Sequence, residues 1–271
     1  MNEKVQDVLK GATEVPGPDG LLVCTKCGKP RQRRLDLPGA PTRIVPVQCA
    51  CQEAAEKERT AREERKSHAA KLEKARRACF PNGGFYRNCT FSADDGRSPY
   101  QSTICARYAE TFTKDDPNGL LLWGEVGTGK SFMSAAIANA VIDLGYSALQ
   151  TDIGSIVSIL ESSYENRHRE LNRILGYDLL CLEDLGAQRC TEYMMGHIYA
   201  VIDGRYKTGK PMVITTNFAL QAISHVRPDD PWSRIFDRII ERCFPVEFKG
   251  TNRRRENGLE MRKAMRERLG I

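Results

Sequence analysis

The stretch that most constrains the fold of this chain is residues 124–131, which read GEVGTGKS. It fits the pattern G-x-x-x-x-G-K-[ST], in which glycines let successive backbone N–H groups turn inward around a phosphate. The pattern predicts that Lys130 reaches the β- and γ-phosphates of a nucleotide and that the Ser131 hydroxyl helps to hold Mg²⁺. The nucleotide-binding residues predicted here are Gly124, Glu125, Val126, Gly127, Thr128, Gly129, Lys130 and Ser131.

The segments on either side of this loop agree with the interpretation. Residues 119–123 read Gly-Leu-Leu-Leu-Trp, which is typical of a short buried strand, and residues 132–144 read as a helix. A helix that starts at the loop adds its partial positive charge to the phosphate site. Because strand, loop and helix follow one another in this order, a mere glycine-rich turn with a surface lysine is the weaker interpretation.

Composition narrows the class of protein. The 271 residues, 41% of them hydrophobic, are enough for a sizeable core. There is no run of 18 apolar residues, and the N-terminal MNEKVQDVLKG lacks the apolar segment of a signal peptide, so we expect a cytoplasmic protein without a membrane span. A net charge of +6 is compatible with nucleic-acid binding without requiring it.

The cysteines near the N-terminus come in two close pairs. Cys24 and Cys27 form the first pair, and Cys49 and Cys51 form the second after a gap of 21 residues. Thiolates on two tight turns can converge on one tetrahedral ion, so the spacing predicts a structural Zn²⁺ site with four cysteine ligands. Free thiols remain the alternative, because the second pair is C-x-C and not C-x-x-C.

Three segments follow from these patterns. We expect residues 1–52 to form a zinc-binding N-terminal domain and residues 81–271 to form the α/β domain that carries the phosphate loop. Between them, residues 53–80 are dense in Glu, Lys, Arg and Ala, with opposite charges three or four positions apart. This pattern predicts a solvent-exposed linker helix.

Polar residues follow two further buried strands. In YDLLCLEDLG, residues 177–186, four apolar residues precede Glu183 and Asp184. We expect Glu183 to bind Mg²⁺, directly or through water, and Asp184 to orient and polarise an attacking water. Asn217 ends the strand expected at 211–217, where its amide can hydrogen-bond phosphate and water. Helix capping by the carboxylates and a turn-forming Asn217 are the alternatives.

A late helix, residues 232–243, repeats arginine every four positions, at Arg234, Arg238 and Arg242. One face of this helix therefore carries three guanidinium groups. The face is either an ordinary solvated surface or the source of an arginine that enters the nucleotide site of a neighbouring subunit and stabilises transition-state charge.

The assembled pattern, from about residue 85 to residue 260, resembles the AAA+ ATPases, and within them the DnaC/DnaI helicase loaders and the related IstB transposition ATPases. The resemblance rests on GEVGTGKS, on LLCLEDLG at 179–186, on VITTN at 213–217, and on DRIIERC at 237–243 followed by FKGTNRR at 248–254. It implies an α/β fold: an AAA+ P-loop ATPase core with a five-stranded parallel sheet and no C-terminal lid, behind a small zinc-binding domain and linker helix.

The resemblance also implies roles for individual residues. Glu183, Asp184 and Asn217 would be catalytic, Arg242 would be the arginine finger with Arg238 beside it, and Arg254 would be the sensor 2-like residue that contacts nucleotide. ATP, Mg²⁺ and Zn²⁺ are the expected cofactors.

Together, the resemblance and the cysteine pairs predict an ATP-dependent loader that delivers a DnaB-type replicative helicase to single-stranded DNA in replication initiation. It would assemble as an ATP-dependent homo-oligomer, grip DNA along residues 153–173 and hydrolyse ATP slowly, as a switch. Two alternatives stay open. One is an IstB-like ATPase that assists a transposase on duplex DNA, and the other is a P-loop kinase of a small molecule, in which Asn217 and the arginine helix would have no role.

Overall fold

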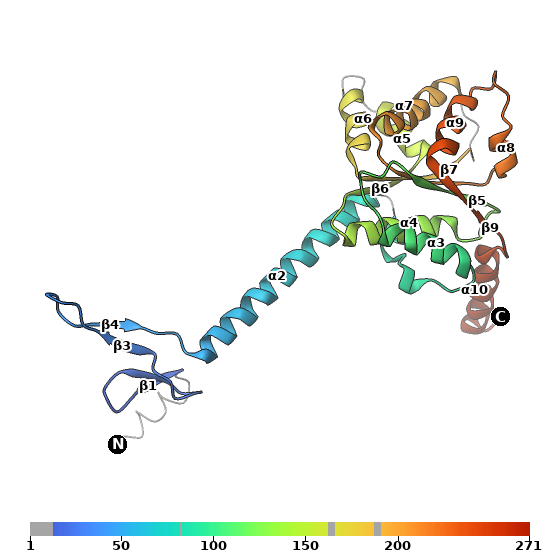
Figure 1. Ribbon diagram of the computed structural model, residues 1–271. Helices are drawn as coiled ribbons and strands as arrows, with labels where there is room; N and C mark the ends of the chain where they lie inside the picture. The colour runs from blue at the N-terminus through green and yellow to red at the C-terminus, as the bar shows by residue number, and fades with distance from the viewer. Residues whose placement is uncertain (1–12, 82, 162–165, 187–190) are drawn as a thin grey trace. The chain divides into compact units, whose positions relative to one another are not determined.

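The computed structural model describes residues 13–81, 83–161, 166–186 and 191–271 (Figure 1). The chain divides into two compact units, residues 1–70 and residues 71–271, and each is described by itself. Parts of two expectations, the zinc-binding domain at 1–52 and the DNA-binding segment at 153–173, lie outside the described residues.

The first unit is built from two antiparallel ribbons. Strand β1 (Glu14–Pro16) pairs with β2 (Leu22–Cys24), and β3 (Gln32–Leu35) pairs with β4 (Arg43–Pro46). The sequence did not predict these strands, which are three or four residues long and, except for β2, carry charged side chains. Among residues 13–70 only Leu21, Cys24 and Cys49 are buried, so an apolar core contributes little to holding this unit together.

Helix α2 (Ala50–Cys79) continues from the first unit into the second. Pairs such as Glu56 with Arg59 and Glu73 with Arg77 lie one turn apart on its surface, as expected of a charged, exposed helix. The division between the units falls inside this helix, after Ala70. The domain limits expected at 52 and 80 stay a prediction.

The second unit contains a five-stranded parallel sheet in the order β6-β7-β8-β5-β9, which confirms the predicted fold class. The three inner strands are nearly continuous apolar runs because helices cover both of their faces. Their carboxyl ends meet at one edge, where the polar residues after them gather. The strands are β5 (Gly119–Gly124), β6 (Ala148–Asp152), β7 (Leu179–Leu185), β8 (Met212–Thr216) and β9 (Cys243–Phe248).

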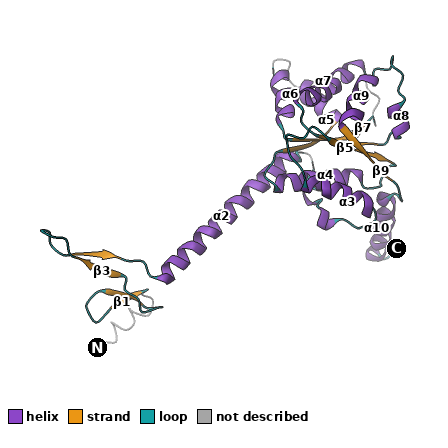
Figure 2. Ribbon diagram, in the orientation of Figure 1, coloured by secondary structure: helices purple, strands orange, loops and turns teal. Residues whose placement is uncertain are grey.

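Helices form a layer on each side of the sheet (Figures 1 and 2). One core cluster joins the sheet to α5 (Ile153–Glu161), α6 (Arg167–Gly176), α7 (Glu192–Thr208) and α9 (Ser233–Arg242). A second cluster, on the other face, joins it to α3 (Pro99–Glu110), α4 (Lys130–Asp143) and the end of α2. The shorter helices are η1 (Tyr86–Asn88), η2 (Phe91–Ala93) and α8 (Leu220–Ser224).

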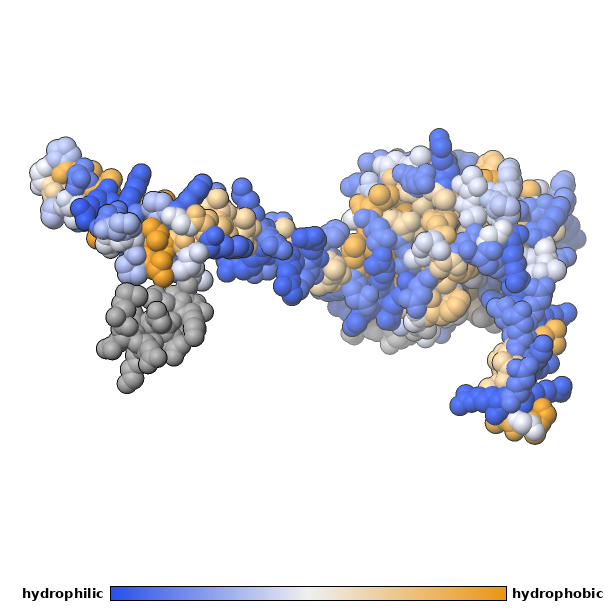
Figure 3. All heavy atoms as spheres, turned by 90° about the horizontal axis from the view of Figure 1, so that it is seen from below, coloured by the Kyte–Doolittle hydropathy of each residue, from blue (hydrophilic) through white to orange (hydrophobic). Residues whose placement is uncertain are grey.

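Helix α10 (Arg253–Leu269) follows the last strand and has no buried residue. In the space-filling view it stands at the lower right and carries both hydrophilic and hydrophobic side chains (Figure 3). The absence of a C-terminal lid stays a prediction. Within the described ranges, no helix is both long enough and apolar enough to span a membrane.

Candidate nucleotide site and metal centre

The phosphate loop connects β5 to α4 and depends on glycine at close approaches. Gly127 has φ +83, and a Cβ there would lie 2.2 Å from Oδ1 of Asn252. Gly124 has φ +129, and its Cβ would lie 2.2 Å from the carbonyl oxygen of Phe248. Only glycine fits both the left-handed backbone and the space at these two positions.

Lys130 is the first residue of α4 and is folded back onto the loop. Its Nζ donates to the carbonyl oxygens of Gly124 (2.8 Å) and Glu125 (2.7 Å). The Thr128 hydroxyl also donates to the carbonyl of Glu125, at 2.8 Å. Burial lowers the pKa of Lys130, and the charge of Asp184 opposes this shift. The loop therefore holds the lysine close to where phosphates are expected.

Glu183 lies on β7 and is only 7% exposed. Its Oε2 accepts a hydrogen bond from the Thr215 hydroxyl at 3.0 Å, whereas its Oε1 has no partner among the residues that the structure describes. Burial raises the pKa of Glu183, and the hydroxyls of Ser131 and Ser134 oppose this. An unpartnered carboxylate oxygen beside a serine hydroxyl suits Mg²⁺, which prefers oxygen ligands, so these residues fit the ion.

Asp184 occupies an unusual backbone conformation. Its φ is +54, in the left-handed region. No other non-glycine residue in the described ranges has a positive φ. Its N–H donates to the Thr215 hydroxyl at 2.9 Å, and the pairing of β7 with β8 shifts register between Leu182 and Leu185. This irregularity leaves Glu183 buried, while Asp184 is exposed and lines the nucleotide cavity. A strained backbone such as that of Asp184 is typical of functional sites.

A cavity of about 450 Å³ brings most of the predicted nucleotide residues together. It lies at the carboxyl edge of the sheet, the usual ligand position in open α/β folds. The predicted residues that line it are Val126, Gly127, Gly129, Lys130, Ser131, Asp184, Asn217 and Arg254. Glu183 lines an adjoining cavity, which shares Tyr86 and Asp184 with the first.

Sequence reasoning missed several lining residues, among them Phe85, Tyr86 and Arg253. The Arg253 N–H donates to the carbonyl of Gly127 at 3.0 Å, and its guanidinium group pairs with Asp95 (3.0 Å) and with the Ser98 hydroxyl (2.7 Å). The first turn of α10 is thereby attached to the phosphate loop. No local motif marks such a contact, because it joins distant parts of the chain.

The arginine helix α9 lies away from this cavity, and none of its three candidate arginines lines it. Arg238 forms an ion pair with Asp203 at 2.7 Å and lies 4.9 Å from the ring centre of Tyr199. Arg242 lies 4.8 Å from the ring centre of Tyr206. A finger acts on the site of a neighbouring subunit, so that role stays a prediction.

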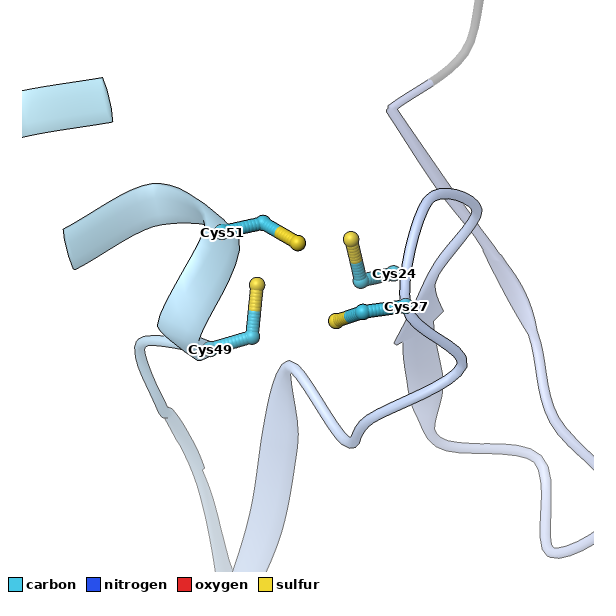
Figure 4. A group of neighbouring side chains, drawn as sticks. All are labelled: Cys24, Cys27, Cys49 and Cys51. Atoms are coloured by element: carbon cyan, nitrogen blue, oxygen red, sulfur yellow. The ribbon is translucent and has the colours of Figure 1, made fainter. Parts of the chain in front are cut away.

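The four predicted zinc ligands converge in the first unit (Figure 4). The Sγ atoms of Cys24, Cys27, Cys49 and Cys51 all lie within 4.8 Å of one another. Four thiolates around one Zn²⁺ at about 2.3 Å require S···S distances of about 3.8 Å, so the cluster fits the ion with small side-chain adjustments. No ligand position is open, which is typical of a structural site.

The surroundings of the cluster favour thiolates. A hydrogen bond with the Gln52 backbone, aided by the nearby Arg31, lowers the pKa of the Cys49 thiol to about 6. Gly28, with φ +68, closes the turn after the first pair by donating its N–H to the carbonyl of Cys24 at 2.8 Å. Zinc binds the deprotonated thiol, so this environment suits it.

Several relatives of this chain are replicative helicase loaders. The chain is 29% identical to the replicative helicase loader DnaI of Bacillus subtilis over 147 residues, which cover 50% of this chain and 47% of DnaI. It is 24% identical to the replicative helicase loader DnaC of Escherichia coli K12 over 190 residues, which cover 67% of this chain and 74% of DnaC. The chain thus spans about half the length of DnaI.

A solved structure and a family agree with these relatives. The crystal structure of the DnaC helicase loader superposes with a TM-score of 0.53 at 22% identity, covering 62% of this chain and 100% of that one, which supports the fold. Residues 50–261 match the family of IstB-like ATP binding proteins. Since that match takes in most of the chain, the protein belongs to the family of IstB-like ATP binding proteins, and its second unit has the fold of the DnaC helicase loader.

Proposed function

We propose that this chain is an ATP-dependent loader that binds a DnaB-type replicative helicase and delivers it to single-stranded DNA. Two relatives reported above, DnaI and DnaC, are replicative helicase loaders. The observation that carries the proposal is the combination, in one chain, of a four-cysteine unit with an AAA+ unit whose nucleotide cavity gathers Lys130, Asp184 and Asn217. A nucleotide-driven switch would use the second unit to distinguish ATP from ADP and the first unit to contact the partner.

Within the nucleotide site we assign roles by position. Lys130 binds the outer phosphates, and Ser131 with Glu183 holds Mg²⁺, which neutralises phosphate charge. Asp184 orients the attacking water from the cavity side, and Asn217 makes a second polar contact with that water or the phosphate. Burial of Glu183 and exposure of Asp184 support this division, although the order Glu-Asp would not by itself indicate it.

ATP-dependent assembly of the chain into a homo-oligomer is part of the proposal, with Arg242 as the finger. The Arg238 guanidinium is held by Asp203 and by the Tyr199 hydroxyl, at 3.0 Å. Nε of Arg242, by contrast, has no hydrogen-bond partner among the described residues and lies in a longer ion pair, 3.8 Å from Oε1 of Glu241. Arg242 is therefore the easier of the two to release toward a neighbouring protomer, and Arg254 on α10 is the sensor within the same protomer.

The partner surfaces are assigned by charge and by unit. The four-cysteine unit contacts the helicase, and single-stranded DNA follows α5 and α6, where Arg169 and Arg173 are exposed and can track a phosphate backbone. Hydrolysis is expected to be slow, as in a switch. Assistance to a transposase on duplex DNA has less support, because the relatives reported above are named as helicase loaders.

The test is a size and mass measurement of the full chain mixed with the replicative helicase of its own genome, with ATP or ADP. We expect ATP-dependent co-elution that is lost in Lys130→Ala and in Cys24→Ser, and kept in the control Arg59→Ala, which removes only a surface pair with Glu56. If no complex forms while ATP drives assembly on duplex DNA, the proposal fails in favour of the transposase-assisting function.

A further inference from the structure

Tyr86, which no motif marks, lies between the nucleotide cavity and the end of α2. It lines the cavity that contains Lys130 and also a second cavity of about 300 Å³. That second cavity is lined by Phe80, directly after α2, and by Glu183 and Asp184. All of these residues belong to the second unit. Tyr86 and Asp184 line both cavities, and Tyr86 also contacts Phe80 in the segment that follows the linker helix.

The Tyr86 ring is held in place by its neighbours. It stacks on Phe80 with ring centres 6.2 Å apart and planes 29° apart, and it meets Phe85 edge-on at 5.7 Å. A Cβ on Gly83 would lie 2.5 Å from Cδ2 of the ring, so the glycine allows the ring to pack directly against the backbone. These contacts fix the position of the hydroxyl group.

The Tyr86 hydroxyl is a free donor in a charged setting. It has no hydrogen-bond partner within residues 13–81, 83–161, 166–186 and 191–271. Burial raises the pKa of Tyr86, and the charge of Glu183 raises it further while Arg254 opposes, so the phenol keeps its proton at neutral pH. A phenol that keeps its proton beside the residues proposed to bind Mg²⁺ and phosphate can donate a hydrogen bond to a phosphate oxygen.

The same region is tied to the helix that starts at the phosphate loop. Nε of Arg76, in the last turn of α2, donates to Oδ1 of Asn139 on α4 at 3.2 Å, and Arg76 also forms an ion pair with Asp143. The Asn139 amide in turn donates to the carbonyl of Tyr86 at 2.9 Å. The end of α2, Tyr86 and α4 are therefore linked by direct contacts that change together if Tyr86 moves.

We propose that the Tyr86 hydroxyl donates a hydrogen bond to the terminal phosphate of ATP, and that its packing on Phe80 passes the difference between ATP and ADP to the last turn of α2. ADP lacks the oxygen that this donor would reach, so the contact exists in one nucleotide state only. Such a differential contact is what a ligand needs to shift a conformational equilibrium. The inference rests on the proposed function for ATP binding alone and does not involve the helicase.

Binding of a non-hydrolysable ATP analogue and of ADP, measured by calorimetric titration, tests the first half. Tyr86→Phe keeps the ring and removes the donor, so we expect about five- to tenfold weaker binding of the analogue and unchanged binding of ADP. The matched control is Tyr108→Phe, whose hydroxyl donates to the carbonyl of Asn118 at 3.2 Å outside the cavity. The control should change neither affinity. Equal losses for both nucleotides, or none, in Tyr86→Phe would overturn the proposal.

Hydrogen exchange tests the second half. The Phe80 amide donates to the carbonyl of Arg76 at 3.0 Å and reports the last turn of α2. We expect the ATP analogue to slow exchange in this turn relative to ADP in the wild type and in Tyr108→Phe, but not in Tyr86→Phe. If the exchange rate of this turn in the wild type is the same with the ATP analogue and with ADP, the inference is overturned. Failure to bind the helicase, with these nucleotide effects intact, counts against the loader function alone.

Discussion

The two units of this chain are held together in different ways. In the described part of the first unit only Leu21, Cys24 and Cys49 are buried, and two of these three belong to the four-cysteine cluster. The second unit buries apolar residues on both faces of its sheet, in two clusters. Each buried aliphatic side chain contributes about 1.5–3 kcal/mol, whereas a structural Zn²⁺ contributes about 10–16 kcal/mol at one point. We therefore expect the first unit to depend on a bound metal ion for its fold and the second unit to fold without one.

Removing zinc should produce the largest difference between the units. Chelation, or Cys24→Ser, removes the main constraint on residues 13–49, and we expect this region to lose its protection from hydrogen exchange. The sheet of the second unit should keep its protection, since it contains no part of the cluster. Unchanged protection in the first unit after verified zinc loss would show that its ribbons fold without metal.

The next largest effect is expected from Lys130→Ala, in the second unit. The substitution removes the two charged hydrogen bonds that Lys130 donates to the loop. It also removes the proposed contact of Lys130 with the outer phosphates. We expect ATP affinity to fall by about 100-fold, corresponding to about 3 kcal/mol, and hydrolysis to be lost. Zinc content, measured by mass spectrometry, should not change. Near-normal ATP binding would contradict the assignment of the loop.

A smaller effect is expected at Gly127. Alanine there meets both a left-handed backbone and the Asn252 side chain, which caps the start of α10 by accepting a hydrogen bond from the Arg255 N–H. We expect about tenfold weaker ATP binding. Gly145→Ala is the matched control, because Gly145 has φ +92 but nothing within 4 Å of an added Cβ. The control should lower stability by about 1 kcal/mol without affecting ATP. Equal ATP affinities in the two variants would show that the start of α10 does not contribute to the nucleotide site.

The smallest effect is expected at the end of α2. Arg76→Ala breaks the ion pair with Asp143, which is about half exposed, so we expect a loss of about 0.5–1 kcal/mol in thermal unfolding of the second unit. The neighbouring Arg77→Ala is the control, because its partner Glu73 lies on α2 itself. A larger loss in the control would mean that Arg76 does not fasten this helix to the ATPase unit.

Much of the second unit could be predicted because its features are local. The phosphate loop, the apolar strands and the polar residues after them each occupy a few consecutive positions, and the parallel sheet follows from their order. The zinc ligands were likewise indicated by close cysteine pairs, and their Sγ atoms do converge.

What could not be predicted arises from contacts between distant residues. The left-handed φ of Asp184 depends on a register shift against β8. Attachment of Arg253 to the loop and to Asp95, and the position of Tyr86 between two cavities, join segments up to about 155 residues apart. The short ribbons of the first unit have charged sequences without clear alternation, so their pairing is set by the cysteine cluster and the turns.

The most direct test of the account compares one preparation before and after zinc removal, by titrating both the ATP analogue and the replicative helicase. We expect that the first unit needs zinc to bind the helicase and that the second unit binds ATP without zinc. Zinc removal should then leave the ATP affinity within about twofold of its original value and abolish helicase binding. Loss of ATP binding together with helicase binding, or helicase binding that survives without zinc, would contradict it.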